Sequence, residues 1–297
     1  MGIKKVGVVG CGLMGHGIAQ VAAQAGFEVT VLEGGQDFLD KGLGRIRKSL
    51  DKFASKSVEK GKATAEDAKA GADAAFGRIR GTLDKADLAD RDIIIEAIVE
   101  DLDVKRALFK ELGELCQAST IFASNTSSFP IGEMAAASGR PDRFVGLHFF
   151  NPVQLMRLVE VVRTDETSEE VFATARGFGE SVGKTPVACK DTPGFVVNRL
   201  LVPYMSQALL MLDRGDASAE DIDAAMQLGC GHPMGPLTLT DYVGLDTTLY
   251  ILEGWVERYP NEPAFEIPAI LKQKVAEGKL GRKSGEGFYK WDGDKKQ

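Results

Sequence analysis

The chain has 297 residues, which suggests about two domains of ~150 residues each. A hydrophobic content of 44% and a charged content of 27% permit a packed core and argue against extensive disorder. The net charge of -7 argues against a general nucleic-acid binder, and no apolar run approaches the ~20 residues of a membrane span, so we expect neither nucleic acid nor a membrane as a partner.

The first two thirds of the chain alternate between apolar strands and helical patterns. Lys4–Val9 and Glu28–Leu32 are predicted strands, and the small-residue helix Gly15–Ala25 between them makes a βαβ unit. Further strands are predicted at Arg78–Thr82, Asp92–Ile98, Ile121–Ser124, Phe144–His148, Arg157–Val162 and Thr185–Ala188, with a helix at Val104–Leu115. This alternation predicts an α/β domain over residues 1–190, with a Rossmann-type, doubly wound, mostly parallel sheet.

The pattern changes near Lys190–Pro193, where we place the domain boundary. Helical periodicity then runs through Val196–Arg214, Ser218–Leu228, Pro236–Arg258 and Pro268–Glu277. We therefore expect an all-helical C-terminal domain over residues 191–297. The polar tail Asp292–Gln297 is expected to be frayed.

A glycine-rich motif joins the first strand to the first helix. Gly10-Cys11-Gly12-Leu13-Met14-Gly15 matches G-x-G-x-x-G in the strand-to-helix context that gives this motif its meaning. Gly10 permits the turn, Gly12 admits a pyrophosphate, and Gly15 allows close packing of helix on strand. The N-terminus of the helix offers N–H donors to the phosphates. These features predict a dinucleotide site.

Glu33 ends the second strand, near the ~20-residue offset of a ribose-binding acid. A carboxylate there accepts hydrogen bonds from the ribose hydroxyls and repels the 2′-phosphate of NADP. We therefore predict NAD as the cofactor.

The segment Lys41–Lys62 is unusually basic, with eight Lys or Arg residues and two acids. Arg45, Lys48, Lys52 and Lys56 share one helical face, so they can offer positive charge to an anion. The charge pattern alone favours the alternative, an ordinary solvated helix face.

A histidine and a glutamate mark the candidate catalytic centre. His148 ends a strand, and ligands of open α/β sheets bind at the carboxyl ends of strands. An imidazole with a pKa near ~6.5 suits the removal of a proton from an alcohol while hydride leaves. Glu160, within the apolar run Leu158–Val162, needs a partner if it is buried, and His148 is a plausible one. A solvent-facing Glu160 is the alternative.

Two further polar positions follow from the same logic. Ser124–Ser128 follows a strand at its carboxyl end, so one of its hydroxyls can donate to a substrate oxygen or take part in ordinary turn chemistry. Asn198 lies near the start of the first C-terminal helix, where its side chain binds either a ligand or the neighbouring backbone.

His16 and His232 are expected to be structural or surface residues. The four cysteines, Cys11, Cys116, Cys189 and Cys230, form no C-x-x-C pair, so we expect free thiols and no metal site. Nothing like a signal peptide precedes the first strand, and we expect a cytoplasmic protein.

Taken together, these motifs resemble the L-3-hydroxyacyl-CoA dehydrogenase family, which includes 3-hydroxybutyryl-CoA dehydrogenases. The similarity runs over almost the full length, through blocks at Gly10–Gln20, Glu96–Glu100, Ser124–Ser128, His148–Pro152, Lys190–Phe195, Asn198-Arg199, Met234–Pro236, Asp241–Asp246 and Gly285–Tyr289. The resemblance implies NAD-dependent, reversible oxidation of (S)-3-hydroxyacyl-CoA to 3-oxoacyl-CoA, within fatty-acid or butanoate metabolism.

The resemblance also implies roles for individual residues. His148 would be the general base and Glu160 its partner, with Ser127 and Asn198 binding the reacting substrate. Cofactor contacts would come from Gly10, Gly12, Leu13, Met14, Gly15, Glu33, Glu100, Lys105, Ser127, Asn151 and Lys283. Ser49 and Lys56 would hold CoA, and the helical domain would form a homodimer.

Two positions depart from the family pattern: Glu33 replaces an aspartate, and His16 replaces a small residue. The alternatives to this reading are a dehydrogenase of a free hydroxy acid and a non-catalytic NAD-binding protein with the same fold.

Overall fold

The computed structural model describes residues 2–297, which divide into two compact units, residues 2–195 and Val196–Gln297. The first unit is built on an eight-stranded sheet in the order β3-β2-β1-β4-β5-β6-β7-β8. Its strands are β1 (Lys5–Val9), β2 (Glu28–Leu32), β3 (Ile79–Thr82), β4 (Ile93–Glu96), β5 (Ile121–Ser124), β6 (Phe144–Phe149), β7 (Leu158–Arg163) and β8 (Thr185–Lys190). The prediction of a doubly wound, mostly parallel sheet is confirmed.

One strand pair departs from parallel pairing. β6 and β7 run antiparallel, whereas β7 and β8 are parallel to each other. Only eight residues, 150–157, separate β6 from β7, and a parallel crossover needs a dozen or more. The chain therefore has to return antiparallel at this point.

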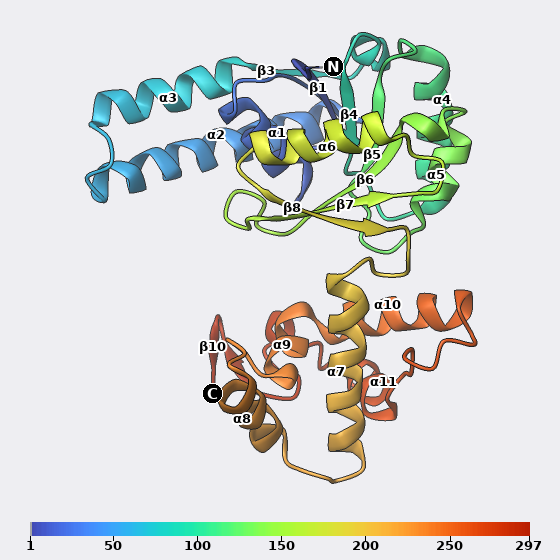
Figure 1. Cartoon of the computed structure of the whole chain (residues 1–297). Coiled ribbons are helices and arrows are strands. Elements are labelled where there is room, and N and C mark those ends of the chain that lie inside the picture. The colour runs from blue at the N-terminus through green and yellow to red at the C-terminus, as the bar shows by residue number, and fades with distance from the viewer. Residues whose placement is uncertain (1) are drawn as a thin grey trace. The chain divides into compact units, whose positions relative to one another are not determined.

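Helices cover both faces of the sheet (Figure 1). α1 (Gly15–Gln24), α2 (Gln36–Glu59), α3 (Ala65–Gly77) and α6 (Glu169–Ser181) pack on one face, whereas α4 (Leu102–Leu115) and α5 (Ile131–Ala137) pack on the other. Successive strand residues point to opposite faces, so Ile93 and Ile95 join one core cluster and Ile94 joins the other. Burial on both faces explains the continuous apolar runs of the strands. In Figure 1, α2 and α3 lie side by side as an extended pair.

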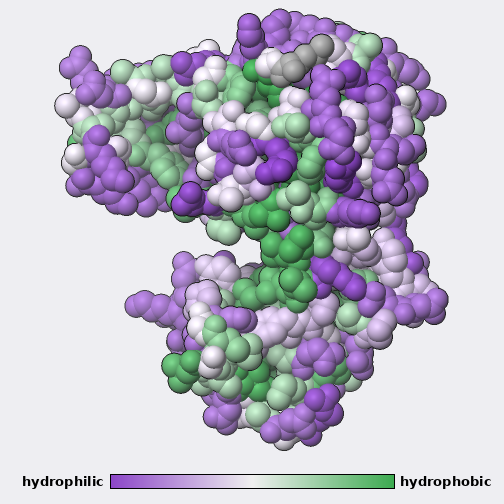
Figure 2. Space-filling model, viewed as in Figure 1, coloured by the Kyte–Doolittle hydropathy of each residue, from purple (hydrophilic) through white to green (hydrophobic). Residues whose placement is uncertain are grey.

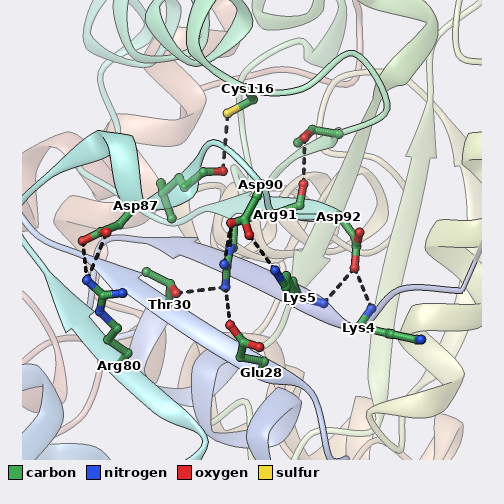
Figure 3. Close-up of polar contacts among 12 residues, drawn as sticks. Lys4, Lys5, Glu28, Thr30, Arg80, Asp87, Asp90, Arg91, Asp92 and Cys116 are labelled. Carbon is green, nitrogen blue, oxygen red and sulfur yellow. Dashed lines mark hydrogen bonds and ion pairs between the residues drawn. The ribbon is translucent and has the colours of Figure 1, made fainter.

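Charged side chains form ion pairs and hydrogen bonds at the amino ends of the strands (Figure 3). The glycine loop follows the opposite, carboxyl end of β1. The buried guanidinium of Arg91 donates to Glu28 at 3.0 Å, to Thr30 at 3.1 Å and to Asp90 at 2.5 Å. Asp90 also accepts from Lys5 at 2.5 Å. These two cationic partners lower the pKa of Asp90 to about 2.

The second unit contains α7 (Val197–Asp213), α8 (Ala219–Cys230), α9 (Pro236–Val243), α10 (Leu245–Arg258) and α11 (Ala269–Ala276). Its core gathers Met205, Leu209, Leu237, Leu252 and Trp255. Among residues 2–297, no helix combines the length and apolar character needed to cross a membrane.

Two details of the second unit differ from the sequence prediction. The single helix expected over Pro236–Arg258 is two helices, because Gly244 adopts a φ of +105° and breaks the helical path. The tail is not frayed: β9 (Trp291–Asp292) pairs antiparallel with β10 (Lys295–Lys296). The indole Nε1 of Trp291 donates to buried Asp241 at 2.8 Å, which anchors this short hairpin.

Candidate active site

The glycine loop between β1 and α1 has the geometry that a dinucleotide pyrophosphate requires. Gly10 has a φ of +91°, and a Cβ on Gly15 would lie 1.8 Å from the carbonyl oxygen of Gly10. Nothing lies within 4 Å of the position that a Cβ would take on Gly12, so the backbone there is open to a ligand. Leu13 and Met14 complete the loop at the start of α1, and these residues fit an NAD molecule.

Glu33 lies at the mouth of this loop. Its Oε1 accepts from the backbone N–H of Cys11 at 2.5 Å and its Oε2 accepts from Gly34 at 3.2 Å. Burial, together with the charge of Glu33, raises the pKa of the Cys11 thiol to about 12. Cys11 therefore stays neutral and adds no negative charge beside the phosphates.

The predicted catalytic pair meets across two neighbouring strands. His148 on β6 lies directly opposite Glu160 on β7, and Nδ1 of His148 donates to Oε2 of Glu160 at 2.7 Å. Glu160 is fully buried, and His148 is 6% exposed. The bond occupies Nδ1, so Nε2 is the nitrogen that can accept a substrate proton.

Aromatic rings enclose this imidazole. The ring centroids of Phe150 and Phe195 lie 4.4 Å and 5.7 Å from that of His148. The side-chain amide of Asn125 accepts the backbone N–H of Phe149 at 2.9 Å, which joins the loop after β5 to the strand that carries His148. The imidazole of His148 is thus held by Glu160, and the backbone of the next residue, Phe149, is held by Asn125.

A buried polar network orders the loop that contains Ser127. Lys105 is 1% exposed, and its ammonium donates to Glu96 at 2.5 Å and lies 3.1 Å from Glu100. Glu100 in turn accepts from the hydroxyl of Thr126 at 2.5 Å. Within this network Lys105 holds Glu100, and Glu100 holds the residue that precedes Ser127.

Two acids near the site, Glu96 and Asp191, were not predicted as site residues from the sequence. Glu96 ends the isoleucine-rich strand β4 and is fully buried, where it also accepts from Ser124 at 2.6 Å. The signal was the same as for Glu160: an acid inside an apolar strand needs a partner. Asp191 accepts the backbone N–H groups of Ile131 and Gly132 at 2.9 and 2.8 Å, at the start of α5, where Pro130 provides no side-chain cap.

The basic helix borders a cavity. Arg45, Lys48, Ser49, Lys52, Phe53 and Lys56 of α2 line a space of about 370 Å³ together with His16, Pro152, Gln154 and Leu155. Figure 2 shows hydrophilic residues along the lower edge of the α2–α3 pair, where α2 lies. Ser49 and Lys56 are therefore brought together beside Pro152, the residue that follows Asn151.

The remaining predicted site residues lie in the second unit. Asn198 is the second residue of α7, and Lys283 belongs to a short 3-10 helix, Arg282–Ser284. The ammonium of Lys283 lies 2.5 Å from Oδ1 of Asp246. Their placement at the active site stays a prediction.

Comparisons with known proteins give one consistent result. Residues 5–192 match the model of the 3-hydroxyacyl-CoA dehydrogenase NAD binding domain, and residues 194–291 match that of the 3-hydroxyacyl-CoA dehydrogenase C-terminal domain. The human mitochondrial hydroxyacyl-coenzyme A dehydrogenase is 50% identical over 293 residues, covering 97% of this chain and 91% of the relative. A probable 3-hydroxybutyryl-CoA dehydrogenase from Deinococcus radiodurans is 50% identical over 287 residues, covering 97% and 100%. Among solved structures, (S)-3-hydroxybutyryl-CoA dehydrogenase from Ralstonia eutropha superposes with a TM-score of 0.91 at 40% identity, covering 98% of this chain and 99% of that one.

Proposed function

Because the chain belongs to the 3-hydroxyacyl-CoA dehydrogenase family, we propose that His148 is the general base of its reaction and that Glu160 holds this base in place. The reaction is the reversible, NAD-dependent oxidation of (S)-3-hydroxyacyl-CoA to 3-oxoacyl-CoA. The observation that carries the proposal is the 2.7 Å hydrogen bond between these two side chains, both almost inaccessible to solvent.

The pair works by moving and holding one proton. Bound NAD supplies the acceptor for the hydride that leaves C3 of the substrate. Nε2 of His148 takes the hydroxyl proton, and the ring becomes an imidazolium whose charge is compensated by the carboxylate of Glu160. Glu160 also fixes the ring with a hydrogen on Nδ1, which keeps a lone pair on Nε2 for the substrate. We assign the donors to the substrate oxygen to Ser127 and Asn198.

The cofactor contacts follow the loop described above. Gly10, Gly12 and Gly15 admit the pyrophosphate, and Glu33 accepts hydrogen bonds from the adenosine ribose. Asn151, Glu100, Lys105, Ser127 and Lys283 are the further proposed contacts, with Lys105 acting through Glu100. The charge of Glu33 opposes a 2′-phosphate, so we infer a preference for NAD over NADP; equal KM values for the two cofactors would contradict this.

The CoA nucleotide is proposed to lie in the cavity beside α2. Ser49 and Lys56 provide the contacts named from the sequence, and Arg45, Lys48 and Lys52 add positive charge to the same cavity. A cation-lined cavity in a protein of net charge -7 suits the polyanionic end of CoA.

The assembly and location are further proposals. Apolar side chains are exposed in the helical unit, including Leu200 at 69%, Tyr250 at 63% and Leu228 at 88% exposure, and they support the proposal of a homodimer through this unit. Light scattering on a sizing column checks this, and a monomer at micromolar concentration would contradict it. The four free cysteines support a reducing cytoplasmic location, which fractionation of the source cells tests.

Steady-state kinetics test the proposed function. The wild-type protein should produce NADH from (S)-3-hydroxybutyryl-CoA and much less from free 3-hydroxybutyrate. His148→Ala should lower kcat by ~10²–10⁴-fold and leave NADH binding intact, because only the proton acceptor is removed. His232→Asn, a change to a histidine of the other unit, serves as the control. Turnover close to wild type in His148→Ala would refute the assignment.

A further inference from the structure

His16 lies at the junction of the cofactor loop and the basic cavity. It is the second residue of α1, and its side chain lines the cavity of about 370 Å³ beside α2. The family resemblance gave this residue no role. Its ring is only partly buried, so it can meet a ligand that enters the cavity.

The orientation of the ring is fixed by one hydrogen bond. Nδ1 of His16 lies 2.8 Å from the carbonyl oxygen of Gly12. A carbonyl only accepts, so Nδ1 must carry the hydrogen and Nε2 is the nitrogen left for a ligand. The neighbouring turn of α1 is held against residues 151–155, since Gln154 donates to Gln20 at 3.0 Å.

The charges that face the ring are positive. Helix α2 contributes Arg45, Lys48, Lys52 and Lys56 to the same cavity, whereas the residues of α1 and of segment 152–155 carry no charged side chain apart from His16 itself. Glu33, the acid beside the glycine loop, accepts from Cys11 and is not among the residues that line this cavity. A phosphate group that enters this cavity would therefore face the His16 ring and four cationic side chains at once.

This arrangement assigns His16 to the acyl-CoA site, and the assignment rests on the proposed function. We propose that the imidazolium of His16 donates its Nε2–H to a phosphate oxygen of the CoA nucleotide, so that acyl-CoA binding draws a proton onto the ring. The contact is present at low pH and is lost as the pH rises and the bound ring gives up its proton. Affinity for acyl-CoA should therefore weaken with rising pH, whereas a thioester without phosphates should not show this effect.

The test compares two substrates and two variants. KM is measured between pH 5.5 and 8.5 for acetoacetyl-CoA and for S-acetoacetyl-pantetheine, which lacks phosphate, with NADH held saturating. In the wild type, KM for the CoA thioester should rise by ~10-fold or more across this range relative to the pantetheine thioester, as for loss of one charge-assisted hydrogen bond. In His16→Asn, which keeps a donor for Gly12, the relative rise should disappear. His232→Asn should behave as the wild type.

A binding measurement on the unmodified protein makes the test independent of the variant's folding. Titration calorimetry in two buffers of different ionisation enthalpy counts the protons taken up when CoA or NADH binds. Uptake with CoA, lost in His16→Asn, supports the proposal. No uptake with CoA in the wild type, uptake with NADH alone, or a relative rise in KM that persists in His16→Asn overturns it.

Failure of the proposed CoA site would look different. If the cavity does not bind CoA, wild-type KM values for the two thioesters should be equal at every pH, and Lys56→Ala should change neither. If only the role of His16 is wrong, Lys56→Ala still raises KM for the CoA thioester, whereas His16→Asn leaves the pH profile unchanged.

Discussion

Replacing Glu160 by glutamine tests the catalytic pair most directly, because it removes a charge and almost no volume. The carboxylate is fully buried and accepts from Nδ1 of His148 at 2.7 Å. A hydrogen bond to a charged group contributes ~1.5–3 kcal/mol. In the proposed mechanism the carboxylate compensates an imidazolium that forms during proton transfer, so most of this energy should appear in the barrier. At ~1.36 kcal/mol per tenfold change in rate, kcat should fall by ~10- to 160-fold.

The assay is NADH formation from (S)-3-hydroxybutyryl-CoA at saturating NAD, with KM and the melting temperature measured alongside. KM for NAD should change little, because the pair lies on β6 and β7 rather than in the glycine loop. Glu169→Gln is the control, since it removes the acid of an exposed ion pair with Arg163. A kcat within twofold of the wild type in a folded Glu160→Gln protein would refute a catalytic role for the carboxylate.

Three further predictions concern stability. Lys105→Met leaves Glu96 as a buried charge with its main cation gone, so the free energy of unfolding in urea should fall by ~3–5 kcal/mol; a loss below 1 kcal/mol would contradict this. Asp241→Ala leaves three hydrogen-bond donors without their acceptor, among them the Trp291 indole. It should lower the free energy of unfolding by at least ~3 kcal/mol, measured in the same way. Asp90→Asn acts through pH: the folded pKa of about 2 lies below the ordinary aspartate value of 3.8, so ionised Asp90 stabilises the fold above pH 4 and this contribution is lost as the pH falls towards 2. The difference in melting temperature between Asp90→Asn and the wild type should shrink over that range, and a constant difference would refute the linkage.

The strands and the glycine loop of the first unit were predicted well from the sequence, because the residue patterns that indicate them lie within a few adjacent positions. The apolar runs of β1, β2 and β4 and the glycine loop each depend on adjacent residues. The break between α9 and α10 was missed for the opposite reason, since the apolar periodicity continues across Gly244 and only the backbone at that residue shows the turn. The tail was judged by its polar composition, which carries no sign of the bond between Trp291 and Asp241.

The site shows the same division. His148 was found from its place at a strand end, and Glu160 from its apolar surroundings. Their pairing required the antiparallel register of β6 and β7, which spacing alone left open. The ion pairs of Lys105 with Glu96 and Glu100 join a strand end to a helix, so no local sequence pattern could predict which residues pair.

That register has a consequence for how this enzyme can vary. The positions of His148 and Glu160 are set by the backbone ladder of adjacent strands, not by the connection that joins them. The turn at residues 150–157 does not set this alignment, so a change in its length should leave the hydrogen bond between His148 and Glu160 in place. An insertion of one residue inside either strand would turn that side chain to the opposite face of the sheet and separate the pair. A scan of one-residue insertions should therefore separate His148 from Glu160 inside β6 and β7 but not between Phe149 and Leu158.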